Sequence, residues 1–187
     1  MTLERRERIL ARTKELGALT YGDFTLSSGE KSTYYFDGRL LSLDPEGASL
    51  LGPEFLQVAI DCGAEAIGGL TLGADPIVAG VVLTSYLQGS PMQGFLVRKE
   101  AKGHGAGRLI EGPLKPGSKV LIVDDACSTA GSLFLAIAAA EAEGCKVVHV
   151  AAIIDRHQGG DEELARRGYP FTAFLEGTSD GVVKVVP

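Results

Sequence analysis

Residues 120–132 read VLIVDDACSTAGS, and this stretch decides the fold. Its first four residues are apolar without polar alternation, as in a central parallel strand that is buried on both faces. Two adjacent carboxylates, Asp124 and Asp125, follow, then small and hydroxyl residues, and a helix is expected from about Gly131. Open α/β sheets bind ligands beyond the carboxyl ends of their strands, where such loops lie. The stretch therefore predicts both the fold class and the place of the site.

The chain around this stretch alternates between strands and helices from residue 65 onward. Apolar segments of strand length lie at 65–70, 92–97, 119–123 and 147–153. Segments typical of helices lie at 75–88, 131–143 and 161–167. This order predicts an α/β fold with an open, mainly parallel twisted sheet that is flanked by helices and joined by right-handed crossovers.

The first 62 residues predict a different pattern, a helix and a hairpin ahead of the sheet. The expected elements are a helix at 2–16, a hairpin at 23–39 and a helix at 44–62. No internal repeat, low-complexity tract or interdomain linker interrupts the chain. We therefore expect a single domain over 1–187, with the first helix and the hairpin, at about 1–40, as part of it.

Composition excludes several classes of protein. The 187 residues are 45% hydrophobic and 22% charged, which is enough for one full core and argues against intrinsic disorder. No apolar run approaches the roughly 20 residues of a membrane helix, and the N-terminus lacks the apolar segment of a secretory signal. The three cysteines show no metal-ligand spacing, and their odd number argues against a disulfide framework. We expect a reduced, cytoplasmic protein without a membrane partner.

The charge distribution points to a small anionic ligand. A net charge of −6 argues against a dedicated nucleic-acid binder, whose affinity comes mainly from neutralised phosphates. Yet four basic residues lie within eleven positions: Arg98, Lys99, Lys102 and Arg108. This local basic loop in an acidic protein predicts an anionic substrate rather than a polyanion.

The segment after the strand suits a sugar phosphate. The unpaired N–H groups of residues 126–132 and the helix dipole favour a phosphate group. Hydroxyl donors are Ser128, Thr129 and Ser132, and close backbone approach is allowed by Ala126, Ala130 and Gly131. The carboxylates would repel that phosphate but can accept bonds from sugar hydroxyls or hold a hydrated cation. An N-cap in an ordinary turn would explain one aspartate, but not the pair together with the hydroxyl and glycine run.

This segment resembles the phosphoribosyl pyrophosphate (PRPP) signature of type I phosphoribosyltransferases. The resemblance implies that the acidic pair contacts the ribose hydroxyls and that a loop grips the 5′-phosphate. The loop residues are Ala126, Cys127, Ser128, Thr129, Ala130, Gly131 and Ser132. It also implies Mg²⁺ as cofactor, carried by PRPP, with no certain protein ligand and with Asp124 and Asp125 nearest to it.

Further segments resemble orotate phosphoribosyltransferases in particular. The stretch RKEAKGHGAGRLIEG at 98–112 resembles their mobile catalytic loop, FTLSSGEKSTYYFDGR at 24–39 their N-terminal hood, and IIDRHQGG at 153–160 the strand end that binds orotate. GGLTLGADP at 68–76 is the candidate pyrophosphate loop, with Thr71 and Gly73. The resemblance implies transfer of ribose 5-phosphate from PRPP to orotate, a step in pyrimidine (UMP) biosynthesis.

The basic loop has a chemical reason of its own. Breaking the bond between C1 and pyrophosphate passes through an oxocarbenium-like transition state, so cations near the leaving group stabilise the transition state more than the ground state. The candidate catalytic and PRPP-binding cations are Arg98, Lys99, Lys102 and His104. The alternative is that these basic side chains only face solvent and take no part in a site. The resemblance implies a homodimer in which residues 98–108 complete the site of the neighbouring subunit.

Arg156 is the candidate partner of the orotate carboxylate, because a guanidinium can pair with a planar carboxylate through two bonds. The alternatives are that Arg156 is an ordinary exposed arginine or that it pairs with Asp155. The resemblance further implies that Ser128 touches both ligands and that Tyr35 and Phe36 cover the base, although strand aromatics commonly belong to a core.

The sequence departs from the family pattern on the pyrophosphate side. Ser27 and Leu72 stand where many members carry a lysine. The pyrophosphate is therefore expected to rely on backbone N–H groups and on the cations at 98–104. Asp75, which precedes Pro76, is expected to be a helix N-cap rather than a metal ligand.

Two other functions stay open on the residues alone. A transferase specific for a purine would need an acidic or neutral base pocket, which Arg156 and the basic loop disfavour. A PRPP-responsive regulator would need a DNA-binding module, for which the roughly 20 residues before the hairpin are too few.

Overall fold

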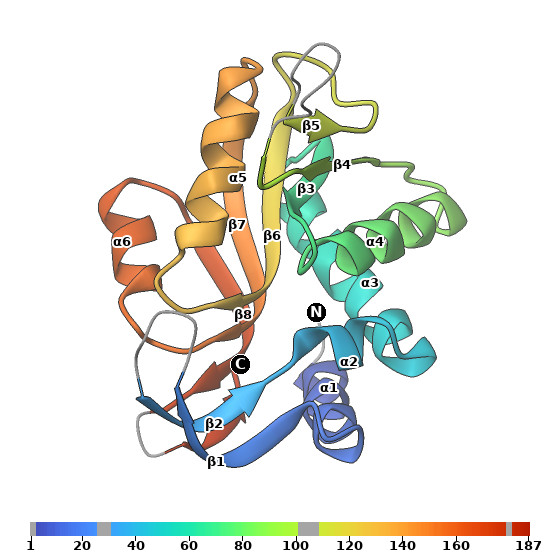
Figure 1. Cartoon of the computed structure of the whole chain (residues 1–187). Helices are drawn as coiled ribbons and strands as arrows, with labels where there is room; N and C mark the ends of the chain where they lie inside the picture. The colour runs from blue at the N-terminus through green and yellow to red at the C-terminus, as the bar shows by residue number, and fades with distance from the viewer. Residues whose placement is uncertain (1–2, 26–30, 101–108, 179–180) are drawn as a thin grey trace.

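The computed structural model describes residues 3–25, 31–100, 109–178 and 181–187. These form a two-stranded hairpin and a seven-stranded sheet of order β5-β4-β3-β6-β7-β8-β9 (Figure 1). The hairpin strands are β1 (Leu19–Thr25) and β2 (Lys31–Phe36). The sheet strands are β3 (Ala66–Leu70), β4 (Gln93–Val97), β5 (Ile110–Glu111), β6 (Lys119–Cys127), β7 (Lys146–Asp155), β8 (Phe171–Gly177) and β9 (Val183–Val185).

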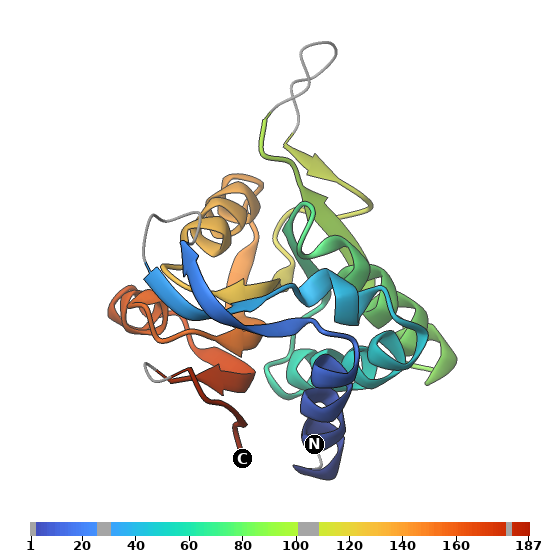
Figure 2. The same ribbon diagram turned by 60° about the horizontal axis from the view of Figure 1, so that its bottom comes forward.

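The predicted fold class is confirmed, since the five inner strands are parallel and only the edge strands β5 and β9 are antiparallel. Helices cover both faces of the sheet (Figure 2). They are α1 (Leu3–Glu15), α2 (Gly38–Ser42), α3 (Pro45–Asp61), α4 (Asp75–Leu87), α5 (Gly131–Ala142) and α6 (Gly160–Arg166). None of the helices in the described ranges is long and apolar enough to cross a bilayer.

Strand β6 forms the centre of the sheet and carries the acidic pair. Its residues 120–123 are fully buried, as the unbroken apolar run predicts. The strand continues four residues beyond the expected end, because Asp124 and Cys127 still pair with Ala152 and Asp155 of β7. The prediction that the carboxylates follow the strand was therefore wrong: they lie within its last residues, where the backbone pairing holds them in place.

Two hydrophobic clusters pack the two faces of the sheet. One joins the sheet to α1, α3 and α4, with Ile9, Phe55 and Val81 among its buried members. The other joins it to α5 and α6, with Leu133 and Leu164. The hairpin lies across the carboxyl ends of the strands (Figure 1) and adds to the first cluster. This packing brings β2 close to the site.

The starts of α3 and α4 differ. Asp44 caps α3 as expected, because its carboxylate accepts the N–H of Gly47 at 2.9 Å. Asp75 is not a cap, contrary to the prediction. It is the first residue of α4, and its Oδ2 accepts the Thr71 hydroxyl at 2.7 Å. This bond ties the candidate pyrophosphate loop to α4.

Candidate active site

A cavity of about 370 Å³ lies at the carboxyl ends of β3 and β6, between the hairpin and α5. Eight of the predicted site residues line it: Tyr35, Phe36, Thr71, Gly73, Lys99, Asp124, Asp125 and Ser132. They come from segments as far apart as β2 and α5. The fold thus brings the hood, the candidate pyrophosphate loop, the basic loop and the acidic pair around one space.

The acidic pair is closely packed by its surroundings. Asp124 is only 6% exposed and Asp125 is half-buried, and the Asp125 N–H donates to Asp124 Oδ1 at 2.9 Å. Two glycines press against the pair. A Cβ atom on Gly73 would lie 2.8 Å from Asp125 Oδ1, and one on Gly38 would lie 2.9 Å from Asp125 Oδ2. Only glycine fits at these two positions without moving the carboxylates.

The surroundings disfavour a negative charge on both carboxylates of the pair. Burial, with the charge of Asp125, raises the pKa of Asp124 to about 7, although a bond to Ser132 acts against this. Burial likewise raises the pKa of Asp125, while Asp124 and the nearby Arg39 lower it. A buried carboxylate prefers to be neutral unless a hydrogen-bond donor or a cation faces it. The pair is therefore suited to hydroxyl donors or a metal ion.

The loop after β6 leads into an uncapped helix. Ala130 adopts a left-handed conformation with φ 60° before α5, and no described side chain caps this helix. Its first N–H groups thus lack a capping acceptor, as a phosphate site requires. Thr129 and Gly131 are exposed, and Ser128 is half-buried. Cys127 differs, because burial and then the charge of Asp155 raise its thiol pKa to about 12, so it is a packing residue.

Residues 156–160, which belong to the predicted orotate-binding segment, form hydrogen bonds to the end of β6 and to the loop that follows it. The Arg156 N–H donates to Cys127 O, and the Gly160 N–H donates to Ser128 O, each at 2.9 Å. A Cβ atom on Gly160 would lie 2.5 Å from Ser128 O and 2.9 Å from Ala130 N. Residues 127–130 and residues 156–160 therefore form one packed unit.

If the loop after β6 binds the phosphate of PRPP, as the resemblance implies, Gly160→Ala is expected to raise the KM for PRPP, because the added methyl group must displace the loop backbone. Overpacking of this kind costs about 1–3 kcal/mol, which corresponds to about a five- to 150-fold change if it falls on PRPP binding. Steady-state kinetics against PRPP measure the effect. Gly80→Ala is the matched control, since a Cβ there meets nothing within 4 Å. Equal KM values in the two variants would contradict the packing argument.

The described cations of the basic loop, Arg98 and Lys99, lie at the rim of the cavity. Arg98 and Lys99 are exposed, and Arg98 Nη1 lies 3.3 Å from Glu111 Oε1. Arg98 lines an adjoining hollow, which it shares with Lys99 and Thr71. Lys102 and His104, predicted from the same loop, lie outside the described residues. So does Ser27, one of the two departures from the family pattern.

Arg156 is connected to the cavity by its contact with the hairpin strand β2. Its Nη2 donates to Phe36 O at 3.3 Å, and its guanidinium lies 5.4 Å from the centre of the Tyr34 ring. Its Nε and Nη1 are buried and have no acceptor among the described residues. Buried donors of this kind need a partner. Phe36 itself is buried in the core, whereas Tyr35, its neighbour, is exposed.

Two charged residues of the cavity were missed in the sequence. Arg39 pairs with Asp37 at 3.0 Å, and Asp37 also caps α2 by accepting the Arg39 N–H. Both line the cavity, and Arg39 acts electrostatically on Asp125. The signal was present in the motif FDGR, whose glycine allows α2 to approach the acidic pair.

Comparison with known proteins agrees with this geometry. A profile described as phosphoribosyl transferase domain matches residues 82–175. An orotate phosphoribosyltransferase of Rhodopirellula baltica is 45% identical over 160 residues, which cover 82% of this chain and 83% of that protein.

Solved structures of orotate phosphoribosyltransferase from Mycobacterium tuberculosis H37Rv also resemble the chain. The complex with Fe(III) dicitrate has a TM-score of 0.80 at 35% identity and covers 92% of this chain and 96% of that one. The complex with PRPP has a TM-score of 0.76 at 30% identity and covers 94% and 91%. With 45% identity to a curated relative and a likeness to these structures over nearly the whole chain, the chain belongs to the orotate phosphoribosyltransferase family.

Proposed function

We propose that this chain transfers ribose 5-phosphate from PRPP to orotate, giving orotidine 5′-phosphate and pyrophosphate, as one domain over 1–187 with a hood at about 1–40. The observation that carries the proposal is a buried acidic pair that leads, within a few residues, into an uncapped helix N-terminus. The carboxylates suit the ribose hydroxyls, and the helix N–H groups suit the 5′-phosphate. A ribose 5-phosphate needs both at this spacing.

The residues also fit a magnesium ion that arrives with PRPP. Asp124 and Asp125 offer oxygen ligands, which Mg²⁺ prefers. Burial raises the pKa of both carboxyl groups and so favours their protonated forms, whereas a nearby cation would favour the ionised forms. When bound to the pyrophosphate, Mg²⁺ would neutralise part of the charge that the leaving group gains. The chain's own part is to hold the ribose while the C1–O bond breaks.

The leaving pyrophosphate is assigned to the candidate loop and the basic residues. Thr71 and Gly73 line the cavity, with Gly73 directly against the acidic pair, and Lys99 also lines it. Lys99, with Arg98, Lys102 and His104 of the same loop, would face the growing charge. These cations would stabilise the transition state more than bound PRPP, because the charge develops only as the bond breaks.

The base is assigned to Arg156 and the hairpin. The two buried guanidinium nitrogens of Arg156 without acceptors, Nε and Nη1, are donors that suit a planar carboxylate such as that of orotate. Phe36 joins Arg156 to the cavity, and Tyr35 would cover the ring that enters it. Ser128, on the phosphate loop, would contact both ligands.

A homodimer is part of the proposal, with residues 98–108 of each subunit reaching the other's site. Support comes from α4, which exposes large apolar side chains at Leu83, Tyr86 and Leu87 (61%, 74% and 74% exposed). Such a face is expected to be covered by another chain rather than by water. A cytoplasmic location is also proposed, and the three cysteines are free within the described chain.

Lys102→Ala is expected to lower kcat by about tenfold or more, with a smaller change in the KM for PRPP, because its charge matters as pyrophosphate leaves. If the loop acts across the dimer, mixing Lys102→Ala with Asp125→Asn chains restores part of the activity. A mixed dimer then assembles one site in which both residues are intact. Absence of recovery, in mixtures shown to exchange subunits, would argue against the shared loop.

The reaction itself is tested by following loss of orotate absorbance with PRPP and Mg²⁺, and by identifying both products. We expect stoichiometric formation of orotidine 5′-phosphate and pyrophosphate, and little reaction after removal of Mg²⁺ by a chelator. An enzyme that binds PRPP but leaves orotate unchanged would contradict the proposal.

A further inference from the structure

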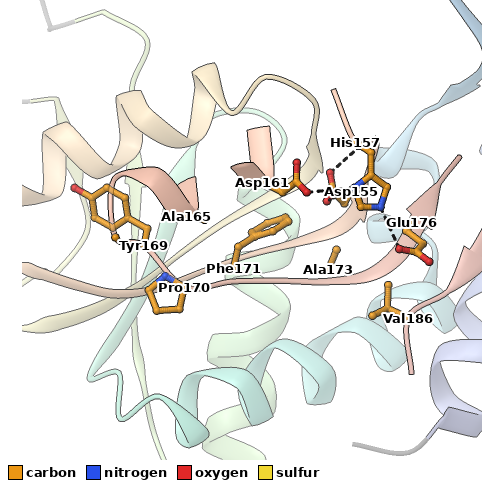
Figure 3. Close-up of a pocket in the computed structure, with 11 residues that line it drawn as sticks. Asp155, His157, Asp161, Ala165, Tyr169, Pro170, Phe171, Ala173, Glu176 and Val186 are labelled. Atoms are coloured by element: carbon orange, nitrogen blue, oxygen red, sulfur yellow. Dashed lines mark hydrogen bonds and ion pairs between the residues drawn. The ribbon is translucent and has the colours of Figure 1, made fainter. Parts of the chain in front are cut away.

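A second polar cluster lies next to Arg156, on the turn that follows β7. His157 occupies its centre, and carboxylates from three elements surround the ring: Asp155 of β7, Asp161 of α6 and Glu176 of β8 (Figure 3). The cluster forms the polar end of an open hollow of about 580 Å³ with Phe171 on its wall. The assigned chemistry of the site uses none of these four side chains.

The imidazole is bound at both of its nitrogens. Nδ1 lies 3.3 Å from Asp155 Oδ2 and 3.3 Å from Asp161 Oδ2, and Nε2 lies 3.1 Å from Glu176 Oε2. A neutral imidazole has one N–H donor and one lone pair. Whichever nitrogen carried the lone pair would face a carboxylate oxygen, so the arrangement is satisfied by the imidazolium ion, with a proton on each nitrogen.

The charges around the ring favour that ion. Partial burial lowers the pKa of His157, but the bond to Glu176, the charge of Asp155 and the bond to Asp161 outweigh it, and the net pKa is raised. Lys184 of β9, a cation beside the cluster, is engaged by the other oxygen of Glu176 at 2.9 Å. Three carboxylates therefore face one titrating cation.

This cluster fixes the backbone on which Arg156 stands. The His157 N–H donates to Asp155 Oδ1 at 2.9 Å, so the residues on both sides of Arg156 are bonded to each other. His157 adopts φ 49°, an uncommon conformation for a residue with a side chain, which surrounding contacts must maintain. Among the described residues, the Arg156 guanidinium has one hydrogen bond, the 3.3 Å bond to Phe36 O, and it lies over the Tyr34 ring. Its position thus depends on the turn.

We propose that His157, as an imidazolium ion, is a positioning residue that holds the turn and thereby sets Arg156 for the substrate carboxylate. The inference rests on the proposed function, because it concerns the orotate side of that site. Loss of the proton would leave one ring nitrogen with a lone pair that faces carboxylate oxygen, at Asp155 and Asp161 or at Glu176, and the turn would lose the positive charge that holds these contacts. Orotate affinity then falls as the pH rises through the pKa of His157.

The experiment measures kcat and both KM values between pH 6 and 9 for the wild type, His157→Asn and His149→Asn. Asparagine tolerates the left-handed conformation, so the first variant removes the charge without forcing a new backbone. His149 is the control, since it lies on β7, the strand that precedes the turn, and bonds Thr172 Oγ1 at 2.9 Å rather than a carboxylate of the cluster. Asp161→Asn is added because it removes one of the charges that favour the imidazolium.

The wild type and His149→Asn are expected to show an orotate KM that rises with pH through one inflection. For His157→Asn we expect an orotate KM that is about fivefold or more above wild type at low pH and independent of pH, with kcat and the PRPP KM changed much less. Asp161→Asn should move the inflection to lower pH. A purely structural role would lower stability and affect both substrates alike.

Three results would overturn the inference. The first is a His157→Asn variant with the wild-type orotate KM and pH profile. The second is an equal loss for both substrates. The third is an orotate affinity that falls after chelator dialysis and returns with Zn²⁺ but not with Mg²⁺, since a metal rather than a proton would then occupy the cluster. If no variant, wild type included, uses orotate, the proposed function fails instead.

Discussion

Asp125→Asn and Asp124→Asn are each expected to lower kcat/KM for PRPP by about ten- to a hundredfold, and the double variant by more. Each change removes a charged acceptor from the ribose hydroxyls, and a hydrogen bond to a charged group contributes about 1.5–3 kcal/mol. The carboxylates lie in the cavity within a strand whose backbone pairing does not depend on them. The loss therefore falls on function rather than on folding.

Stability is expected to change in the opposite direction for Asp124→Asn. The folded chain raises the pKa of Asp124 from 3.8 to about 7, so folding favours the protonated form. The contribution of this group to stability is full below about pH 4 and is lost as the pH rises to about 7. Asparagine does not titrate and keeps the acceptor for the Asp125 N–H, so the variant should be more stable than wild type at pH 8.

Thermal unfolding measures this effect. A gain of about 1 kcal/mol raises Tm by about 2–4 °C in a chain of this size, and the gain should shrink as the pH falls toward 5. Asp61→Asn, at the surface end of α3, is the control for both assays. Wild-type catalytic efficiency in both single variants, or a Tm of Asp124→Asn below that of wild type at pH 8, would show that the pair is structural.

Arg156→Ala is expected to raise the KM for orotate by about ten- to a hundredfold while the KM for PRPP stays nearly constant, since a charge-assisted bond to a buried carboxylate contributes about 1.5–3 kcal/mol. The guanidinium has two buried N–H groups without a described acceptor, so orotate would satisfy donors that are otherwise left unpaired. Uracil, which lacks the carboxylate, should be a poor substrate of the wild type for the same reason.

The control for this variant is Arg166→Ala on α6, whose guanidinium pairs with Glu163 at the surface. It should leave both KM values unchanged. An unchanged orotate KM in Arg156→Ala, or a wild type that uses uracil as well as orotate, would mean that the carboxylate is bound elsewhere.

The sequence predicted those elements whose signal is local. Val120 to Val123 form an unbroken apolar run, and Asp44 with Pro45 begins a helix by chemistry that acts within three residues. The acidic pair was found for the same reason, since two adjacent carboxylates between an apolar strand and a glycine-containing loop are typical of a ligand site.

Features that depend on distant partners were missed. The continuation of β6 through Asp124 comes from its pairing with β7, and the edge strand β9 exists because it pairs with β8. Arg39 enters the site only because Gly38 lets α2 approach Asp125. The His157 cluster joins side chains from three elements, and Glu176 follows the histidine by 19 residues, so no local pattern in IIDRHQGG indicates it.

The most direct test of the central claim is a competition for one limiting pool of PRPP. Orotate, uracil, adenine and hypoxanthine are supplied at equal concentration with Mg²⁺, and the nucleotide products are separated and quantified at early times. We predict orotidine 5′-phosphate as almost the whole product in the wild type, and a much smaller preference in Arg156→Ala. A purine nucleotide or UMP formed as fast as orotidine 5′-phosphate by the wild type would contradict the assignment of this site to orotate.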